Sequence, residues 1–404
     1  MKITDAKLRI ILDSRGKETV AAELIDEKGN KAEAMAPSGT SRSEYEAVPF
    51  ANNSPKASLD AFAGYKGKLL GNEPDMKNID MLLHEIDGTE NFAKIGGNAA
   101  TAISVATAKL AAMQAQQELY QYLYENFTKR TGIKKKIPGL LGNVIGGGVH
   151  SNNNMSIQEI LLATKSGPVM ANAEKNIMIH GAIGNYLKSK DLAIGLNIEN
   201  AWNTKLYDKE AIELAGKYAK DNGTFIGVDC AASEFYKNGK YVFNEPDKTK
   251  REMERSEYIE FVVELAEKNG LVYVEDPLDS NDADGFAEIT KQIGKKALVV
   301  GDDLYATNKE RLQAGIGKNA TNGILIKVNQ VGTLSDVIET AELAHKHGIS
   351  TVVSHRSGET TDAFMAHLGV ALGSEFIKCG VLGGERIAKI NELARIEAVE
   401  LQAL

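Results

Sequence analysis

Six polar residues in the second half of the chain stand at the ends of short apolar runs. They are Asp229, Glu275, Asp302, Lys327, His355 and Lys378, separated by 46, 27, 25, 28 and 23 residues. One strand followed by one helix takes about 30 residues in proteins built from βα units. We therefore predict that each of the six ends a successive parallel strand, which would bring all of them to one face of the sheet.

Three of these side chains, Asp229, Glu275 and Asp302, are carboxylates that would meet at that face. Carboxylates held close together repel one another unless a cation neutralises them. An all-oxygen set suits Mg²⁺, whereas Zn²⁺ prefers nitrogen and sulfur. A single acid of this kind more often caps a helix or forms a surface ion pair, but three at regular spacing, followed by a lysine, favour a metal site.

The lysine of the set, Lys327, follows the apolar run 324–326. Desolvation and neighbouring cations lower the pKa of a buried lysine, which would make Lys327 a general base. The alternative is a strand-end lysine whose charged end simply reaches solvent. We expect the lowered pKa and the catalytic role.

A sequence suited to anion binding follows the next run, where His355, Arg356 and Ser357 are consecutive. Arginine binds phosphate through two parallel hydrogen bonds, so this sequence beside a metal would suit a phosphorylated substrate. His150 lies in another loop at a strand end. The glycines at 146–148 lack the G-x-G-x-x-G register of a dinucleotide loop, and we attribute them to backbone flexibility near a ligand.

The elements that must position these residues are strands alternating with helices. Runs at 225–228, 271–274, 297–300, 323–326 and 350–353 have strand character, and 254–268 and 334–347 have helical character. The long first interval contains a predicted hairpin at 236–243, with Asn238-Gly239 as its turn. Residues that converge on one mouth favour a (β/α)₈ barrel over an open doubly wound sheet, which would spread them along an edge.

The first third of the chain has a different pattern. Alternation over residues 8–12 and 20–24 predicts strands, and residues 99–127 predict a helix. The segment from Thr131 to Pro138, with three consecutive lysines, is typical of a linker. We predict a smaller α+β domain over residues 1–132 and the barrel over residues 133–404.

The composition limits the class of protein. The 404 residues are 43% hydrophobic and 25% charged, as in globular proteins, and the net charge of −8 argues against a nucleic-acid-binding surface. Two cysteines are too few for a disulfide framework. No apolar run approaches the length of a membrane span, and Asp5 and Asp13 interrupt the stretch where a signal peptide needs an apolar core. We expect a cytoplasmic protein with a small-molecule partner.

These residues lie in segments that resemble the enolase family, in order and over nearly the whole chain. The segments are 11–16 (ILDSRG), 37–41 (PSGTS), 87–91 (DGTEN), 157–159 (IQE), 228–229 (VD), 233–235 (SEF), 275–277 (EDP), 301–304 (GDDL), 327–332 (KVNQVG) and 354–360 (SHRSGET). The resemblance implies an enolase-type barrel with an irregular first strand pair behind a smaller α+β domain. It also implies a Mg²⁺-dependent hydro-lyase of glycolysis that converts 2-phosphoglycerate to phosphoenolpyruvate.

The resemblance further implies a role for each site residue. Asp229, Glu275 and Asp302 would hold one Mg²⁺, and Ser41 would bind a second that arrives with the substrate. Lys327 would take the proton from C2, and Glu159 would help to protonate the leaving hydroxyl. The substrate-binding residues would be His150, Gln158, His355, Arg356, Ser357 and Lys378, with Lys378 on the substrate carboxylate. The family also suggests a homodimer, or an octamer built from dimers.

One loop departs from the family pattern, Gly-Asp-Glu-Gly followed by a small residue and an aromatic, in which the glutamate helps to expel the hydroxyl. Residues 195–202 read GLNIENAW. Aligned on Gly195, the position of the acid holds Asn197. Shifted by two residues it holds Glu199, and Ala201-Trp202 match the following pair. We prefer the shift, which makes Glu199 catalytic.

The unusual loop leaves the substrate open. The alternatives to an enolase are a related enzyme that acts on another phosphorylated hydroxy acid, and an enolase-like protein without turnover that serves as a binding or scaffold partner. The set of charged residues at the strand ends favours an enzyme, because a scaffold has no need for buried charges that strain its fold.

Overall fold

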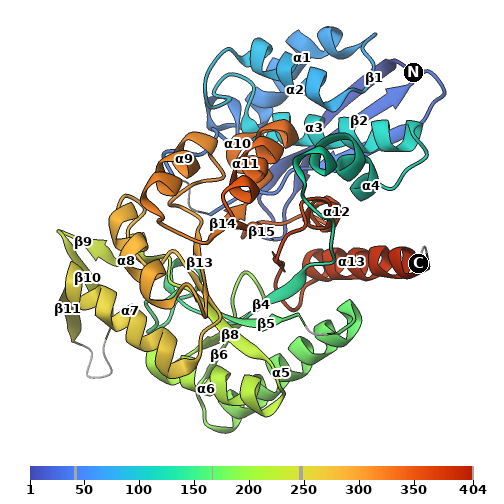
Figure 1. Ribbon diagram of the computed structural model, residues 1–404. Coiled ribbons are helices and arrows are strands. Elements are labelled where there is room, and N and C mark those ends of the chain that lie inside the picture. The colour runs from blue at the N-terminus through green and yellow to red at the C-terminus, as the bar shows by residue number, and fades with distance from the viewer. Residues whose placement is uncertain (41–42, 166, 245–248, 403–404) are drawn as a thin grey trace.

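The computed structural model describes residues 1–40, 43–165, 167–244 and 249–402, which form a smaller α+β unit and a barrel (Figure 1). Three antiparallel strands open the chain: β1 (Ile3–Leu12), β2 (Glu18–Asp26) and β3 (Lys31–Met35), with β2 in the centre. Val20, Ala22 and Leu24 of β2 are buried because the sheet packs on helix α3 (Gly97–Gln114). The strands predicted from the alternating pattern are thus confirmed.

The helices of the first unit are α1 (Pro55–Leu69), α2 (Met76–Asp87), α3 and α4 (Leu119–Leu123). The prediction of one helix over residues 99–127 is wrong, because α3 ends at Gln114 and Gln116 has a φ of 54°, which an α-helix cannot contain. Helix α3 is buried on almost every side, between the sheet and the barrel helices α10 (Val328–Val331) and α11 (Leu334–Lys346). Its many alanines permit this close approach.

Eight strands close into a barrel in the order β4, β5, β8, β12, β13, β14, β15 and β16, and β16 pairs again with β4. They are β4 (Gly139–Gly146), β5 (Glu159–Thr164), β8 (Phe225–Asp229), β12 (Tyr273–Glu275), β13 (Leu298–Gly301), β14 (Gly323–Ile326), β15 (Ser350–Ser354) and β16 (Phe376–Lys378). Strand β5 runs antiparallel to both of its neighbours, whereas the other pairs are parallel. The expected barrel with an irregular beginning is confirmed.

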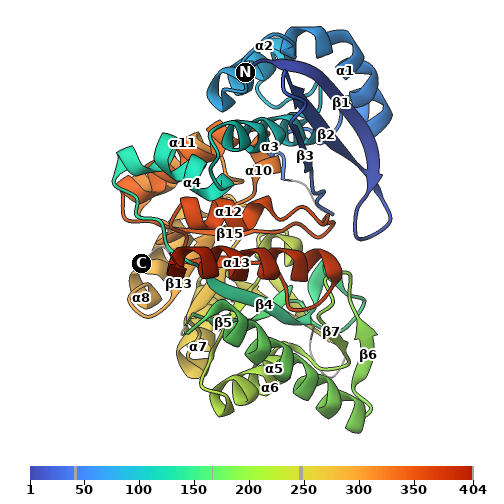
Figure 2. The same cartoon turned by 90° about the vertical axis from the view of Figure 1, so that its right-hand side faces the viewer.

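The outer layer of the barrel is helical. It consists of α5 (Val169–Ser189), α6 (Asp208–Asp221), α7 (Arg255–Asn269), α8 (Ala283–Ile293), α9 (Lys309–Lys318), α10, α11, α12 (Phe364–Ala371) and α13 (Gly384–Gln402). Figure 2 shows α13 lying along α12 and β4. Within the described parts of the chain, no helix combines the length and apolar character that crossing a membrane requires.

Two small strand units project from the barrel. Strands β6 (Ala193–Leu196) and β7 (Trp202–Thr204) form a hairpin that extends the sheet beside β4. The hairpin predicted at 236–243 is confirmed as β9 (Tyr236–Lys237) and β10 (Lys240–Asn244), to which β11 (Lys250–Glu254) adds a third strand.

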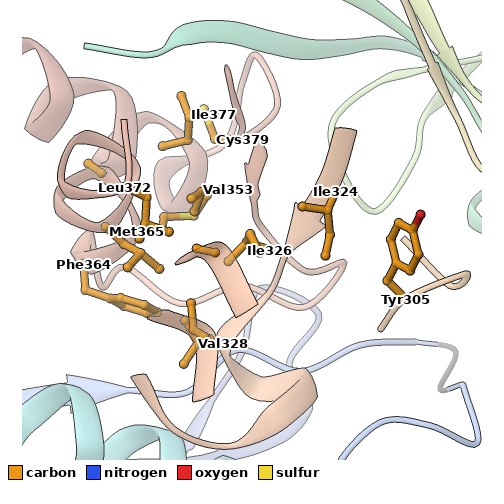
Figure 3. Close-up of a cluster of buried hydrophobic side chains, with 14 of the residues drawn as sticks. Tyr305, Ile324, Ile326, Val328, Val353, Phe364, Met365, Leu372, Ile377 and Cys379 are labelled. Carbon is orange, nitrogen blue, oxygen red and sulfur yellow. The ribbon is translucent and has the colours of Figure 1, made fainter. Parts of the chain in front are cut away.

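The core has an inner and an outer part. The barrel interior is filled by Leu141, Leu161, Ala163, Tyr273, Val300, Leu325, Val352 and Phe376, contributed by seven of the strands. On each strand, the side chains of the face turned away from the barrel interior pack outward. Figure 3 shows Ile326, Val353 and Ile377 packed toward Phe364 and Met365 of α12. This packing fixes the strands whose carboxyl ends carry the polar residues.

A tight contact between α5 and β7 gives a test of the packing. A Cβ atom at Gly184 would lie 2.1 Å from the Trp202 ring, so Gly184→Ala should lower the free energy of unfolding by about 1–3 kcal/mol. Gly181, one turn earlier on α5, has open space around it, and Gly181→Ala should be neutral or stabilise by up to about 1 kcal/mol. Denaturant unfolding measures both variants, and equal stabilities would contradict this packing.

Candidate active site

The six polar residues predicted to end successive strands occupy those positions. Asp229, Glu275 and Lys378 are the last residues of β8, β12 and β16. Asp302, Lys327 and His355 directly follow β13, β14 and β15. All six therefore lie at the carboxyl-end mouth of the barrel, where the side chains of successive parallel strands converge.

One ammonium group joins three carboxylates at the centre of the mouth. Lys378 Nζ lies 2.9 Å from Asp229 Oδ2, 2.9 Å from Glu275 Oε2 and 2.8 Å from Glu159 Oε2. Burial opposes the charge on Lys378, but the three carboxylates outweigh this and hold its pKa well above the usual value. Burial raises the pKa of Glu275 to about 8, with Asp229 adding to the rise and Lys378 opposing it. Tyr273 also donates to Glu275 Oε2 at 2.5 Å.

The other lysine, Lys327, forms an ion pair with Asp302, whose second oxygen accepts from Gln330 Nε2 at 3.1 Å. Burial and the neighbouring cations Arg356 and Lys378 act to lower the pKa of Lys327, but Asp302 outweighs them and raises it. The expected lowered pKa of Lys327 is therefore wrong. The sequence placed both groups at the mouth but did not show that they touch.

A pocket at the mouth is lined by nearly all of the predicted site residues that the structure describes. These are His150, Gln158, Glu159, Glu199, Asp229, Asp302, Lys327, His355, Arg356, Ser357 and Lys378. Glu275 is fully buried and contacts this set through Lys378. Ser41 lies outside the described residues, although Gly39 and Thr40 line the pocket.

Two glutamates form a buried acidic pair on one side of the pocket. Glu159 begins β5 and Glu199 lies in the β6–β7 loop, and each is 2% exposed. Burial raises the pKa of Glu159 well above its usual value, and the neighbouring Glu199 adds to the rise. Burial also acts to raise the pKa of Glu199, but His150, His355 and Arg386 outweigh it and hold that pKa well below the usual range. The two acids therefore titrate as a coupled pair, in which Glu159 holds a proton more readily than Glu199 does.

The β6–β7 loop directs Glu199, and not Asn197, into the site. Asn143 Nδ2 donates to Glu199 Oε2 at 3.2 Å, and His150 Nδ1 lies 3.6 Å from Glu199 Oε1. Asn197 Oδ1 instead accepts from the backbone N–H of Glu199 at 2.9 Å and of Ala201 at 3.0 Å. Asn197 thus shapes the loop from within. Of the two residues that the alternative alignments would make the acid, only Glu199 lines the pocket.

The glycines at 146–148 serve mainly close packing. A Cβ atom at Gly146 would lie 2.1 Å from Asn197 Nδ2, and one at Gly147 would lie 2.4 Å from Ile157 O. Only Gly148 has a positive φ, of 52°. The β4 end can therefore approach the neighbouring loops, which places His150 at the pocket.

Residues of the first unit and of α10 that the sequence analysis missed contact the anion-binding sequence. Glu46 pairs with Arg356 Nη1 at 3.0 Å, and Asn329 Oδ1 accepts from the same nitrogen at 2.9 Å. Arg15 donates to Ser357 Oγ at 3.3 Å. Arg15 and Asn329 lie in the segments ILDSRG and KVNQVG that resemble the enolase family, which was an available signal. Glu46 had none.

Oxygen ligands for a cation are abundant at the mouth. Besides Asp229 and Glu275, carboxylate oxygens of Asp276, Asp302 and Asp303 lie within 4.8 Å of one another. Asp276 accepts from the backbone N–H of Asp302 at 2.9 Å and of Asp303 at 2.8 Å, which ties the β12 and β13 ends together. Sequence reasoning missed Asp276 and Asp303, although each directly follows a predicted ligand. A buried set of carboxylates without thiolates fits a hard divalent cation.

Two family models together match almost the whole chain. The model described as the enolase N-terminal domain matches residues 3–123, and that described as the enolase C-terminal TIM barrel domain matches residues 134–403. The chain belongs to the enolase family. The predicted domain boundary between residues 132 and 133 lies in the gap between the two matches.

Full-length enolases of several archaea are similar to this chain. The enolase of Thermoplasma acidophilum is 44% identical over 407 residues, covering 98% of each chain. The enolase of Picrophilus torridus is 43% identical over 406 residues, again covering 98% of each. That of Natronomonas pharaonis is 44% identical over 405 residues, covering 98% of this chain and 99% of the relative.

The fold accommodates the departure from the enolase loop pattern. With the shifted alignment, Asn200 stands where enolases have the second glycine, and its φ is 62°. Asparagine tolerates this left-handed conformation better than most side chains do. Ile198, at the position of the enolase aspartate, is 39% exposed.

The role of Asn197 in this enolase loop can be tested by hydrogen exchange. Asn197→Ala removes the acceptor of two backbone N–H groups, so the amides of Glu199 and Ala201 should exchange faster and stability should fall by about 1–2 kcal/mol. Asn197→Asp retains an acceptor oxygen and should protect both amides. NMR or mass spectrometry measures the exchange. If the two amides exchanged as slowly in the Asn197→Ala variant as in the unmodified protein, the loop geometry would be contradicted.

Proposed function

We propose that the protein is a hydro-lyase that removes water from 2-phosphoglycerate to give phosphoenolpyruvate, a step of glycolysis and gluconeogenesis. The observation that carries the proposal is the convergence of two lysines, buried acids and an anion-binding loop in one pocket of an enolase-family barrel. The proposed domains are residues 1–132, which cap the site, and residues 133–404, which carry the chemistry.

The proposed metal ligands are Asp229, Glu275 and Asp302, whose oxygen donors suit Mg²⁺. When bound, Mg²⁺ would supply positive charge next to the substrate carboxylate. A second Mg²⁺, arriving with the substrate and bound by Ser41, belongs to the same proposal. Asp276 accepts hydrogen bonds from the backbone N–H groups of Asp302 and Asp303. These bonds support a fixed position for the ligands of the first ion.

Lys327 is the proposed base. The C2 proton of the substrate is weakly acidic, and its removal adds negative charge to a molecule that already carries a carboxylate and a phosphate. Lys327 lies beside Asp302, so a change in the charge of Asp302 acts directly on the proton affinity of the amine. Lys378 stays charged and can pair with the substrate carboxylate, where that negative charge develops.

Glu159 and Glu199 are the proposed acid side of the site. Glu159 holds a proton more readily than Glu199 does, so a proton taken up by the coupled pair can pass toward the leaving hydroxyl. Arg356, Ser357, His150, His355 and Gln158 bind the substrate. The buried pairing of Arg356 with Glu46 supports this role, because it holds the guanidinium in place before a phosphate arrives.

Two further properties belong to the proposal. The protein acts in the cytoplasm, which the two buried free thiols of Cys230 and Cys379 support, since thiols persist in reducing compartments. It also acts as a homo-oligomer, a dimer or an octamer built from dimers, as its family suggests.

The activity itself is tested by mixing purified protein, 2-phosphoglycerate and Mg²⁺ and following the absorbance of phosphoenolpyruvate. We expect turnover that depends on Mg²⁺. Absence of product, with the metal bound and the protein folded, would contradict the proposed substrate.

The base and the acid side can be separated by isotope exchange. Lys327→Ala should stop both dehydration and the exchange of the C2 proton with deuterated water. Glu199→Gln should slow dehydration by about 10²–10⁴-fold and leave C2 exchange largely intact, because the base is untouched. NMR follows exchange and product together. Exchange at the unmodified rate in Lys327→Ala would show that another residue takes the proton.

The metal assignment predicts the behaviour of Asp302→Asn. This substitution keeps the size of the side chain and removes one ligand charge, so Mg²⁺ should bind more weakly and turnover should be lost while the fold remains. Calorimetric titration with Mg²⁺ and circular dichroism measure the two effects. Full activity of the variant at ordinary Mg²⁺, or of the unmodified protein in excess chelator, would refute the assignment.

A further inference from the structure

Helix α13 directs two buried cations at the loop that follows β15. Arg386 and Lys389 lie one turn apart and are 0% and 1% exposed. Lys389 donates to Thr360 O at 2.6 Å and pairs with Glu359 at 2.8 Å, toward the end of the loop. Arg386 reaches the beginning of the loop, which contains the proposed substrate-binding residues. Its side chain does not line the pocket.

Arg386 contacts both the backbone and the histidine of that loop. Its Nη1 lies 2.7 Å from His355 Nδ1 and donates to Arg356 O at 2.8 Å. Its Nη2 donates to Ser357 O at 3.1 Å. A guanidinium remains protonated in proteins and has no acceptor atom. His355 Nδ1 must therefore accept this hydrogen bond, and the proton of the neutral ring must lie on Nε2.

We propose that Arg386 is a positioning residue that keeps His355 neutral, with its ring proton on Nε2 and directed toward Glu199. The distance from His355 Nε2 to Glu199 Oε2 is 3.9 Å. A second proton on Nδ1 would break the bond from Arg386 and bring two cations into contact in a buried site. His355 then acts in the pocket as a fixed hydrogen-bond donor and does not carry protons to or from the substrate.

The charges around His355 favour the same state. The groups that face it are Arg386 from α13, Lys378 from β16, Lys327 from the end of β14 and Glu199 from the β6–β7 loop. Burial is the largest influence and lowers the pKa of His355, and the three cations lower it further. Glu199 alone among these groups opposes them. The balance leaves the pKa well below its usual value, so the ring stays neutral at neutral pH.

The state of the ring can be read directly by NMR of the full-length protein labelled with ¹⁵N-histidine, with His355 assigned by the loss of its signals in His355→Gln. We expect an unprotonated Nδ1 and a protonated Nε2 in the unmodified protein at every pH at which it is folded. In Arg386→Met the pKa of His355 should rise toward its ordinary value, because a donor and a charge are removed.

Lys389→Met is the matched control. It removes a buried cation from the same helix and the same loop without touching His355, so the tautomer and titration of His355 should match those of the unmodified protein. The effect on catalysis rests on the proposed function. In the Arg386→Met variant, kcat for dehydration should fall at acid pH where that of the unmodified protein does not. The pH profile of kcat in the Lys389→Met variant should lack this fall.

Four outcomes separate the possibilities. A proton on Nδ1 in the unmodified protein, or an Arg386→Met variant whose His355 titrates as before, would overturn the positioning role. If Arg386→Met does not fold, the tautomer of the unmodified protein decides alone. The Nε2–H tautomer could also be present although neither the unmodified protein nor any variant forms phosphoenolpyruvate. In that case the proposed function fails and the role of Arg386 stands.

Discussion

The structure of the barrel mouth depends on the neutralisation of buried carboxylates by two lysines. Asp229, Glu275 and Glu159 surround Lys378 at 2.8–2.9 Å, and Lys327 pairs with Asp302. Unpaired charges at this depth would cost several kcal/mol each. The same attraction holds the mouth together and gathers the oxygen atoms that a divalent cation would bind. The stability of the mouth and its ability to bind a metal therefore have one origin.

The smaller unit completes the site, because it supplies the partners that fix the anion-binding loop. Ser38 and Gly358 exchange two backbone hydrogen bonds of 2.8 and 2.9 Å, and Glu46 holds Arg356. On the opposite side α13 supports the same loop through Arg386. The loop is thus held between two elements that lie far apart in the sequence. Its residues can face an anion without first losing conformational freedom, which lowers the entropic cost of binding.

The spacing of the polar residues was enough to predict the barrel and its mouth, because each βα unit occupies a similar length of chain. The same spacing could not show which charges touch, so the pKa of Lys327 was predicted in the wrong direction. Glu46 and Arg386 were missed because tertiary packing alone brings them to the site. Ala201-Trp202 indicated the shift that selects Glu199. The supporting role of Asn197 depends on two hydrogen bonds within the loop, which the sequence does not show.

The central claim is that one pocket at the barrel mouth binds the metal and the substrate together. A crystal structure of the protein with Mg²⁺ and 2-phosphoglycerate tests it most directly. The account predicts an ion bound to oxygens of Asp229, Glu275 and Asp302, Lys378 moved onto the substrate carboxylate, and Lys327 next to C2. An ion bound elsewhere, with Lys378 still against the three carboxylates and the substrate outside the pocket, would contradict it.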